Sequence, residues 1–426
     1  MNTKLQIKSD KIIPFGGFFF VNKFLKQKGI PQLIDKELGI RSTLVGYQYS
    51  EIIHALFDTY LCGGDHIEDI SYIGQFLRQE PCSRIPSSDT IGRAIKELAV
   101  ENVPYKSDNQ TYNFNINSQL NKLLIKINKR LGLLSANSAV DVDFDHQLIP
   151  TEKYDAKMSY KKTKGYFPGV ASAGGCIIYV ENRDGNINVR FHQADTLKRM
   201  LMSLEEEQIA VNQFRADCGS YYKDVVELIA EKCQVFYLRA AHSQEQSIQI
   251  GRIENWQQTE INYQRCDIAS IAYRPLGMKQ DLRLVVQRTE IESGQQLDLF
   301  KGKYIYRSII TNDWQHSEQD IIEIYNKRGA RERDFDQLNN DFGWKHPPCS
   351  FLKQNTVFLI LMAICKNIFT AFLKSICKVF ASLTPTSRVK RFLFSFVNVP
   401  AKWILSGRQW YLKLYTRLPY DKLGFF

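Results

Sequence analysis

The stretch from residue 138 to residue 239 most constrains the fold, because strands come first in it and then alternate with helices. Residues 139–145 alternate apolar and acidic side chains, which is the period of a strand. An order of strands followed by alternating strands and helices predicts an α/β chain built on a mixed sheet. The further strands are predicted at 165–172, 176–181, 189–192, 214–217 and 234–239, and the helices at 196–208 and 221–232.

The segments that flank this stretch have other patterns. Residues 1–134 are mostly helical by their apolar spacing. The helix-start signal in 86–90 precedes an amphipathic helix that carries basic residues off its apolar stripe. A helical pair of this kind fits either a helix-turn-helix DNA reader or a structural bundle. The polar stretch 106–117 predicts a loop or linker, and residues 240–315 predict a β-rich subdomain inserted into the α/β unit. Residues 316–426 then complete the core with helices and a tail.

The positive charge is concentrated at the C-terminal end. Residues 345–426 carry 13 basic side chains and one acidic one, whereas the preceding 344 residues carry 43 basic and 44 acidic groups. A basic segment on a neutral body indicates a polyanionic partner, either nucleic acid or an anionic membrane surface.

Two other features limit the class of protein. The apolar run 356–365 is followed by lysines, and because a membrane span needs about 20 apolar residues, we expect a buried helix with basic groups on one edge and no membrane partner. The nine cysteines are scattered and form no CxxC pair. This pattern predicts reduced thiols in a cytoplasmic protein, not a disulfide framework or a zinc site.

Acidic residues stand at two places where a sheet can hold a ligand. Asp141, Asp143 and Asp145 share one face of the first strand by the period-two rule. Three such carboxylates repel each other unless the face is solvent-exposed or cations neutralise it. Asp217 follows a short strand, and ligand sites of α/β sheets lie at the carboxyl ends of strands; the alternative is an ordinary helix cap.

A third acidic position lies on the helix predicted over 321–332. At about 100° per residue, Tyr325, Arg328 and Glu332 fall within about 60° of one another. One helix face then presents a phenol, a guanidinium and a carboxylate. The alternative is a common surface Arg–Glu pair.

The order of these three positions indicates more than any one of them. An RNase H-like core assembles a two-metal phosphoryl-transfer site from three such residues. They are an Asp on a first strand, an Asp at the end of a later strand and a Glu on a helix beyond an insertion. Three carboxylates are expected to hold two Mg²⁺ ions about 4 Å apart. Mg²⁺ takes oxygen ligands, which fits carboxylates without Cys or His clusters, and Mn²⁺ is the expected substitute.

The sequence resembles the DDE transposases of bacterial insertion sequences, whose third motif is Tyr-x2-Arg-x3-Glu-x6-Lys. Tyr325, Arg328 and Glu332 match at that spacing, and Asn339 stands where the motif has Lys. More closely, the chain is similar to insertion-sequence family thirteen-eighty. The stretches that carry this likeness are 141–143, 165–169, 214–219, 325–329 and 340–344.

The resemblance implies specific roles. Asp143 is the expected first catalytic residue that bridges both metals, with Asp141 as the alternative, because the family's Asp-x-Asp pair leaves the choice open. Asp217 and Glu332 are each expected to hold one metal. Tyr325 and Arg328 are expected to contact phosphates near the cleaved end, and Asn339 removes one cationic contact.

The basic tail supplies the remaining candidates for DNA contact. Arg388, Lys390 and Arg391 lie in its most basic part, and we expect them to bind the DNA backbone. The predicted organisation is therefore a helical DNA-binding region (1–134), an RNase H-like core in two parts (135–239 and 316–426) and the insertion (240–315).

The resulting prediction is a cytoplasmic, nucleoid-associated cut-and-paste transposase. It is expected to bind the terminal inverted repeats of its own element as a homodimer on double-stranded DNA. It would hydrolyse a phosphodiester at each end, after which the freed 3′-hydroxyl attacks the target DNA. The alternative is a catalytically inactive DNA-binding regulator derived from a transposase.

Overall fold

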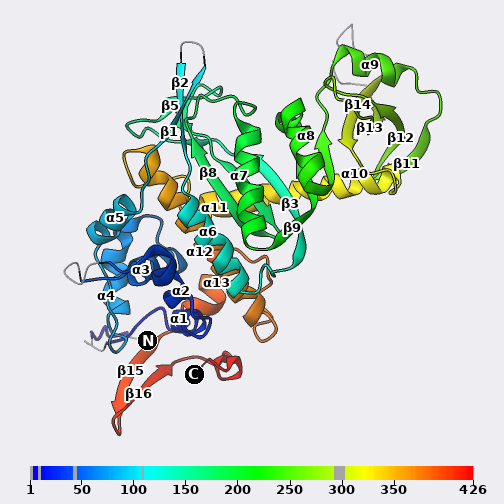
Figure 1. Cartoon of the computed structure of the whole chain (residues 1–426). Coiled ribbons are helices and arrows are strands. Elements are labelled where there is room, and N and C mark those ends of the chain that lie inside the picture. The colour runs from blue at the N-terminus through cyan, green and yellow to red at the C-terminus, as the bar shows by residue number, and fades with distance from the viewer. Residues whose placement is uncertain (1–2, 8–10, 42–45, 108–109, 292–302, 426) are drawn as a thin grey trace.

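The computed structural model describes residues 3–7, 11–41, 46–107, 110–291 and 303–425. Its main feature is a mixed sheet, which has 11 strands within these ranges (Figure 1). Across the sheet the strands are β1 (Val103–Ser107), β2 (Gln110–Asn115), β8 (Cys176–Arg183), β7 (Gly169–Ala173), β3 (Ser138–His146), β9 (Ile209–Ala216), β10 (Cys233–Arg239), β14 (Tyr304–Thr311), β13 (Leu282–Glu290), β12 (Gln264–Tyr273) and β11 (Gln257–Ile261). The predicted α/β class with a mixed sheet is confirmed.

Strand direction decides where the acidic residues meet. β7 pairs antiparallel with β3 and with β8, whereas β9 pairs parallel with β3, and β10 pairs parallel with β9. The carboxyl ends of β3, β9 and β10 therefore lie at one edge of the sheet. The short strands β4 (Ile149–Pro150), β5 (Lys157–Met158) and β6 (Lys164–Tyr166) form a small separate sheet.

Helices cover both faces of the sheet. α7 (Gln193–Glu206) and α8 (Lys223–Lys232) pack on the apolar face that Val142 and Phe144 of β3 present. The opposite face, which carries the acidic residues of β3, is covered by α10 (Glu318–Asn326), the 3-10 turn η4 (Lys327–Ala330) and α11 (Arg331–Asp341) (Figure 1). The alternation of apolar and acidic residues in β3 thus separates a core face from a polar face.

The N-terminal part is helical, as predicted. Its helices are α1 (Phe18–Gln27), α2 (Ile30–Leu38), α3 (Tyr49–Leu61), α4 (Ile70–Leu77), α5 (Ser88–Glu97) and α6 (Ser118–Arg130). Ser87 caps α5 by accepting a hydrogen bond from the Thr90 amide, and Ile91 and Ile95 are buried. These contacts confirm the predicted helix start.

The stretch predicted as a linker, 106–117, is not one in its described part. β1 and β2 form a hairpin, and β2 pairs antiparallel with β8. The last two residues of β2, Phe114 and Asn115, are fully buried where they pair with β8. Residues 108 and 109 of the stretch lie outside the described residues.

Two other strand predictions need correction. Residues 189–192 form turns, and His192 has a left-handed φ of 53° just before α7. The predicted strand 165–172 is divided into β6 and β7 around Pro168, which has no amide hydrogen to donate to a ladder.

The region 240–315 extends the main sheet. β14 pairs antiparallel with β10, so β11 to β14 continue the sheet from its core, with α9 (Gln244–Gly251) beside them (Figure 1). The predicted β content is confirmed. The sequence pattern did not reveal β12 or α9, and residues 292–302 lie outside the described residues.

The apolar C-terminal helix is central to the core. α12 (Leu352–Ile376) is the one helix in the described ranges that is long and apolar enough to cross a membrane, and 94% of its most apolar window is buried inside the protein. The predicted buried helix is confirmed. However, Lys366 does not lie on an exposed edge, because its Nζ donates to the carbonyl of Gly175 at 2.5 Å and lies 2.8 Å from Asp334.

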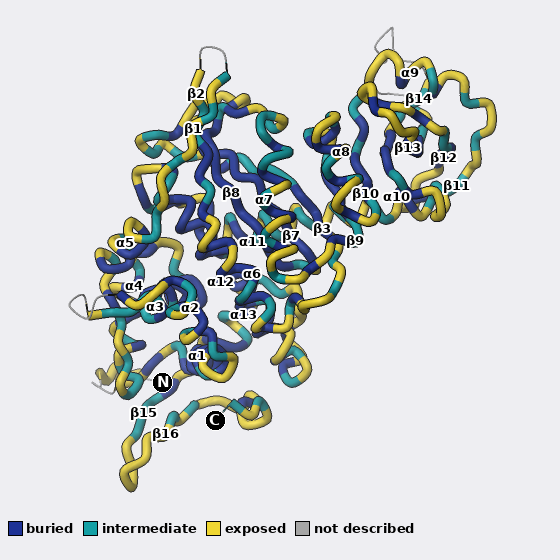
Figure 2. Tube along the Cα trace, viewed as in Figure 1, coloured by how far each residue is buried: buried dark blue, intermediate teal, exposed yellow. Residues whose placement is uncertain are grey.

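A hairpin projects from the body at the C-terminal end. After α13 (Val389–Phe392), strands β15 (Ala401–Ser406) and β16 (Gln409–Leu414) pair with each other, and Ala401 forms an isolated bridge to Ile13. The tip of the hairpin is exposed (Figure 2).

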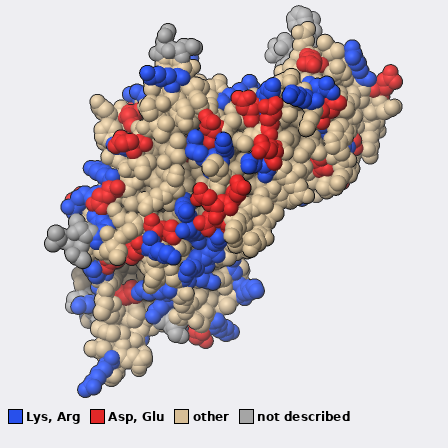
Figure 3. All heavy atoms as spheres, in the orientation of Figure 1, with Lys and Arg blue, Asp and Glu red and all other residues tan. Residues whose placement is uncertain are grey.

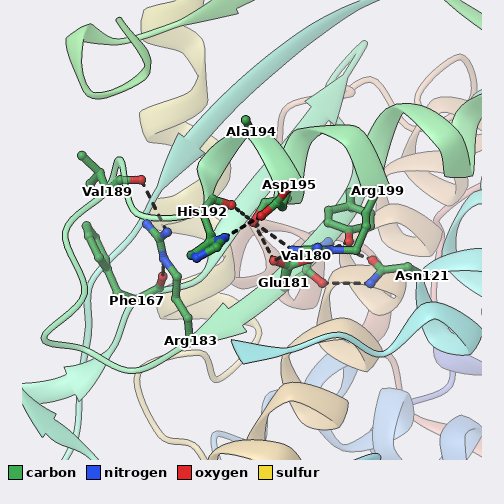
Figure 4. Close-up of polar contacts among 12 residues, drawn as sticks. Asn121, Phe167, Val180, Glu181, Arg183, Val189, His192, Ala194, Asp195 and Arg199 are labelled. Carbon is green, nitrogen blue, oxygen red and sulfur yellow. Dashed lines mark hydrogen bonds and ion pairs between the residues drawn. The ribbon is translucent and has the colours of Figure 1, made fainter. Parts of the chain in front are cut away.

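Buried polar contacts tie β8 to helices α6 and α7 (Figure 4). The Glu181 carboxylate, 1% exposed, accepts hydrogen bonds from Arg199 Nε at 2.8 Å and Nη2 at 2.7 Å. Thr196 Oγ1 donates a third at 2.6 Å. On the other side, Asn121 Nδ2 donates to the carbonyl of Val180 at 2.9 Å. These contacts fix the position of β8 at the side of the core.

Candidate active site at the carboxyl ends of two parallel strands

Two carboxylates lie next to each other where β3 and β9 end. In the parallel register, Asp143 is opposite Arg215 and Phe144 is opposite Ala216. The next positions along the two strands are Asp145 and Asp217. Asp145 and Asp217 therefore occupy neighbouring positions at one edge of the sheet.

The environment of this pair is partly buried and charged. Burial raises the pKa of Asp145, the negative charge of Asp217 raises it further, and the guanidinium of Arg328 opposes both effects. The net effect is a pKa above the usual range for Asp145. Two neighbouring carboxylates with one guanidinium bonded to Asp145 favour a further positive charge.

Asp217 is held by its own loop. It precedes the 3-10 turn η3 (Cys218–Ser220), and its Oδ1 accepts a hydrogen bond from the Gly219 amide at 3.0 Å. A Cβ at Gly219 would lie 3.0 Å from Asp217 Oδ1 and 3.0 Å from Val189 Cγ2. A side chain there would press on the carboxylate, so the glycine keeps space for it.

Arg328 and Tyr325 approach the pair from the other side. Arg328 Nη1 lies 2.8 Å from Asp145 Oδ2, and Tyr325 is 8% exposed, with its ring centre 5.9 Å from Arg328 Cζ. Burial lowers the pKa of Arg328, but Asp145, Tyr325 and Asp217 raise it, and the net shift is upward. Of the three residues matched to the Tyr-x2-Arg-x3-Glu motif, Arg328 therefore contacts Asp145, and Tyr325 lies beside Arg328.

Asp143, the predicted first catalytic residue, has a different environment. It is 3% exposed, and Arg215 donates to both of its oxygens, from Nε at 2.7 Å and from Nη2 at 3.0 Å. Arg331 Nε lies 3.3 Å from its Oδ2. The carboxylate is thus engaged by two guanidiniums.

Asp141, the predicted alternative, is exposed and accepts a hydrogen bond from Asn212 Nδ2 at 3.0 Å. The structure therefore places neither Asp141 nor Asp143 at the position beside Asp217. Asp145 belongs to the same Asp-x-Asp-x-Asp run, and its place at the very end of the strand was the signal that could have selected it.

The helix predicted over 321–332 is interrupted. The 3-10 turn η4 separates α10 from α11, and a 3-10 helix has 3.0 residues per turn rather than 3.6. Four residues of such a turn rotate the next helix by roughly 80° relative to a continuous α-helix. As a result Arg331 faces Asp143.

Glu332 lies at the start of α11 and is exposed to solvent. Its side chain makes no hydrogen bond or ion pair with any residue in the described ranges. Its role as a third catalytic carboxylate stays a prediction. Next to it, Arg331 Nη1 lies 2.6 Å from Asp334 and donates to Ser172 Oγ at 3.0 Å, so α11 is fixed on the sheet by a residue that the sequence did not single out.

The donor set fits a hard divalent ion. Mg²⁺ takes oxygen ligands, keeps several waters and commonly binds through one or two carboxylates; Asp145 and Asp217 supply two. In the part of the chain that the structure describes, no group of three or more His, Cys, Asp or Glu side chains is placed to hold a metal. The predicted pair of ions with three protein carboxylates therefore stays a prediction.

Some of the basic side chains near the C-terminus have acidic partners. Lys353 lies 2.5 Å from Glu101, Lys366 pairs with Asp334, and on the face shown in Figure 3 basic and acidic side chains are interspersed. The local excess in sequence is therefore partly neutralised by residues from other segments.

The three tail residues predicted to bind DNA differ in whether a carboxylate neutralises their charge. Arg388 Nε lies 2.6 Å from Asp341 Oδ2, and its Nη1 contacts Asp336. Lys390 is exposed, and so is Arg391, whose Nε donates to the carbonyl of Ser382 at 3.3 Å. Of the three, only Lys390 and Arg391 keep their charge without a carboxylate partner in the described ranges.

We expect Arg388→Gln to lower the free energy of unfolding by up to about 1 kcal/mol, because its ion pairs are partly exposed. Lys390→Gln and Arg391→Gln should leave the melting temperature unchanged. If they contact phosphates, each should reduce the slope of log Kd against log salt by about one unit. Thermal melts and salt titrations with duplex DNA check both effects. Normal stability of Arg388→Gln together with a reduced slope would instead make Arg388 a DNA contact.

Known proteins resemble this chain at the level of the family. No curated protein sequence matches it. Among solved structures, a piggyBac transposase synaptic complex with hairpin DNA is weakly similar, with a TM-score of 0.46 and 10% identity, over 89% of this chain and 79% of that one. The profile of the family described as Transposase DDE domain group 1 matches residues 3–424. Because that match spans nearly the whole chain, the protein belongs to this family of DDE transposases.

Proposed function

We propose that this transposase cuts DNA phosphodiester bonds at the site formed by Asp145 and Asp217. The observation that carries the proposal is the neighbouring position of these two residues on parallel strands, with Arg328 bonded to Asp145. Family membership supports DNA as the substrate. Phosphoryl transfer needs little covalent chemistry from a protein, and positioning with charge stabilisation supplies most of the catalysis.

The chain's own residues divide the work. Asp145 and Asp217 would hold a divalent ion, Mg²⁺ or Mn²⁺, and when bound such an ion supplies Lewis-acid stabilisation of charge on the phosphoryl oxygens. Arg328, 2.8 Å from Asp145, would donate charge-assisted hydrogen bonds to a phosphate oxygen of the bound strand. Tyr325 is buried beside it and would fix its orientation.

Asp143 has a positioning role in this proposal. Its ion pairs join β3 to Arg215 of β9 and to Arg331 of α11. Arg215 Nη1 also donates to the carbonyl of Ile324 in α10 at 2.9 Å. These bonds connect the two strands of the site to the helices that carry Tyr325 and Arg328.

The proposal also includes the fold of the core, a third carboxylate and the course of transposition. An RNase H-like core is supported by the antiparallel order of β8, β7 and β3 and the parallel order of β3, β9 and β10. We propose Glu332 as the third carboxylate. Its side chain is exposed and has no partner in the described ranges, so it can bind an ion without breaking another contact. Two metal ions, terminal inverted repeats, a cut-and-paste route, a homodimer on DNA and likeness to family thirteen-eighty are included on the strength of the sequence motifs.

The direct test is metal-dependent cleavage. We expect the protein to cut a duplex that carries the ends flanking its own gene when Mg²⁺ or Mn²⁺ is added. Chelation should stop cleavage, because the two carboxylates lose the cation that they require. Binding of the duplex should persist. Gel analysis of end-labelled strands measures the cuts. Specific binding without cuts in the presence of either metal would support the inactive regulator instead.

A further inference from the structure

A second polar site lies one strand away from the carboxylate pair. In the parallel register of β9 and β10, Ala216 is opposite Leu238, so the next positions are Asp217 and Arg239. Neighbouring strands are about 4.8 Å apart. Asp145, Asp217 and Arg239 thus occupy equivalent positions on three neighbouring strands and form a row across the sheet.

The row leads into a pocket of about 110 Å³ between the strands of the 257–311 region and α10. Arg239 is opposite Ile309 of β14, and Arg307 lies two residues from Ile309 on the same face of the sheet. The polar side chains that line the pocket are Arg239, Arg307, Asn262, Gln264, Gln287 and Asn326.

The charges in this pocket are unbalanced. No carboxylate is among its lining residues, and in the described ranges neither Arg239 nor Arg307 makes an ion pair. Burial lowers the pKa of Arg239, Tyr325 opposes this shift, and the positive charges of Arg307 and Arg328 add to it, so the net shift is downward. Arg239 is half-buried and Arg307 is exposed. Two neighbouring cations without a carboxylate partner repel each other, so the pocket favours an anion.

The amides of the pocket supply additional donors. No hydrogen bond to another described residue satisfies the side chains of Asn262, Gln264 and Asn326. Asn262 and Tyr263 have φ values of 52° and 62°, which form the tight turn between β11 and β12. This turn holds Asn262 and Gln264 at the mouth of the pocket, where their N–H groups can point to a bound oxygen.

We propose that this pocket binds a backbone phosphate of the DNA strand whose neighbouring phosphodiester lies at Asp145 and Asp217. The identification of the anion as DNA rests on the proposed function. Arg239 and Arg307 would form charge-assisted hydrogen bonds to the phosphate oxygens, and the amides would complete its shell. The pocket thereby aligns the strand across the row from Asp145 to Arg239.

The test compares two double variants that remove equal charge. Arg239→Gln/Arg307→Gln empties the pocket of cations. Arg274→Gln/Lys279→Gln removes two exposed cations beyond the far end of β12, about 30 Å along the strand from the Asn262 turn. The dissociation constant for a labelled 20-base-pair duplex of random sequence is measured at several salt concentrations without divalent ions.

We expect the pocket variant to reduce the slope of log Kd against log salt by about one unit and the control variant to leave it unchanged. Equal slopes in all three proteins would overturn the proposal. Arg307→Gln alone, at an exposed position, repeats the test if the double variant unfolds.

The cleavage assay separates this inference from the proposed function. A lower slope in a protein that never cuts DNA would support the phosphate site and remove the catalytic proposal. Cleavage by the wild type together with an unchanged slope in the pocket variant would support the catalytic proposal and remove the phosphate site.

Discussion

Replacing Asp217 with asparagine is expected to abolish strand cleavage while DNA binding and folding persist. Asparagine keeps the size of the side chain and its bond to the Gly219 amide, but it removes the negative charge that a divalent ion needs. Loss of several kcal/mol of charge stabilisation in the transition state corresponds to a cleavage rate reduced by about 10³-fold or more. Asp145→Asn should have the same effect, because Asp145 occupies the position beside Asp217.

The matched control is Asp141→Asn on the same strand. Asp141 is exposed and bonded to Asn212, so this variant should cut at the wild-type rate. Single-turnover cleavage of end-labelled DNA at saturating protein measures all three variants, and equilibrium binding is measured in parallel. Normal cutting by Asp145→Asn would remove that residue from the site and return the first catalytic position to Asp143 or Asp141.

Asp143→Asn separates positioning from catalysis. This change leaves Arg215 and Arg331 without their shared carboxylate, so we expect reduced stability, with cleavage in the folded fraction impaired less than in Asp145→Asn. Melting temperatures identify the stability loss. A stable Asp143→Asn protein with no cleavage would contradict the positioning role.

Replacing Arg199 with methionine should lower the free energy of unfolding by about 3–5 kcal/mol, which is the cost of breaking a buried ion pair from one side. Methionine fills the space of the aliphatic part, but Glu181 then keeps a buried charge without its cation. The hydrogen bonds from Thr196 and from Tyr179, whose hydroxyl lies 2.8 Å from Glu181, do not neutralise it. Urea unfolding followed by circular dichroism measures the loss.

Two further measurements identify the buried charge as the cause. Glu181→Gln added to Arg199→Met should recover most of the stability, because a neutral amide can accept from Thr196 through its oxygen and donate to the Tyr179 hydroxyl through its nitrogen. The loss in Arg199→Met should also be smaller in mildly acidic than in neutral solution, since protonation removes the orphaned charge and stabilises the folded state as pH falls. A deficit that neither the second substitution nor lower pH reduces would assign the effect to packing instead.

Local pattern was sufficient for most of the fold. The alternation in 139–145 predicted β3, because side chains of a strand alternate between its two faces regardless of its partners in the sheet. The helix-start signal in 86–90 predicted the start of α5, and the apolar run in 356–365 predicted a buried helix. The hairpin β1–β2 was missed because its polar residues resemble a linker until β8 is there to pair with it.

The sequence by itself determined that acidic residues stand near the ends of two strands and that Tyr325 and Arg328 share a helical face, since both depend on neighbours in the chain. Only the tertiary structure decided which acidic residue meets Asp217. The parallel register of β3 and β9, set by pairing across about 70 residues, brings Asp145 to that position and gives Asp143 to Arg215. The 3-10 turn η4 likewise turned Arg331 toward the sheet, because packing against β3 overrides the regular helical rotation.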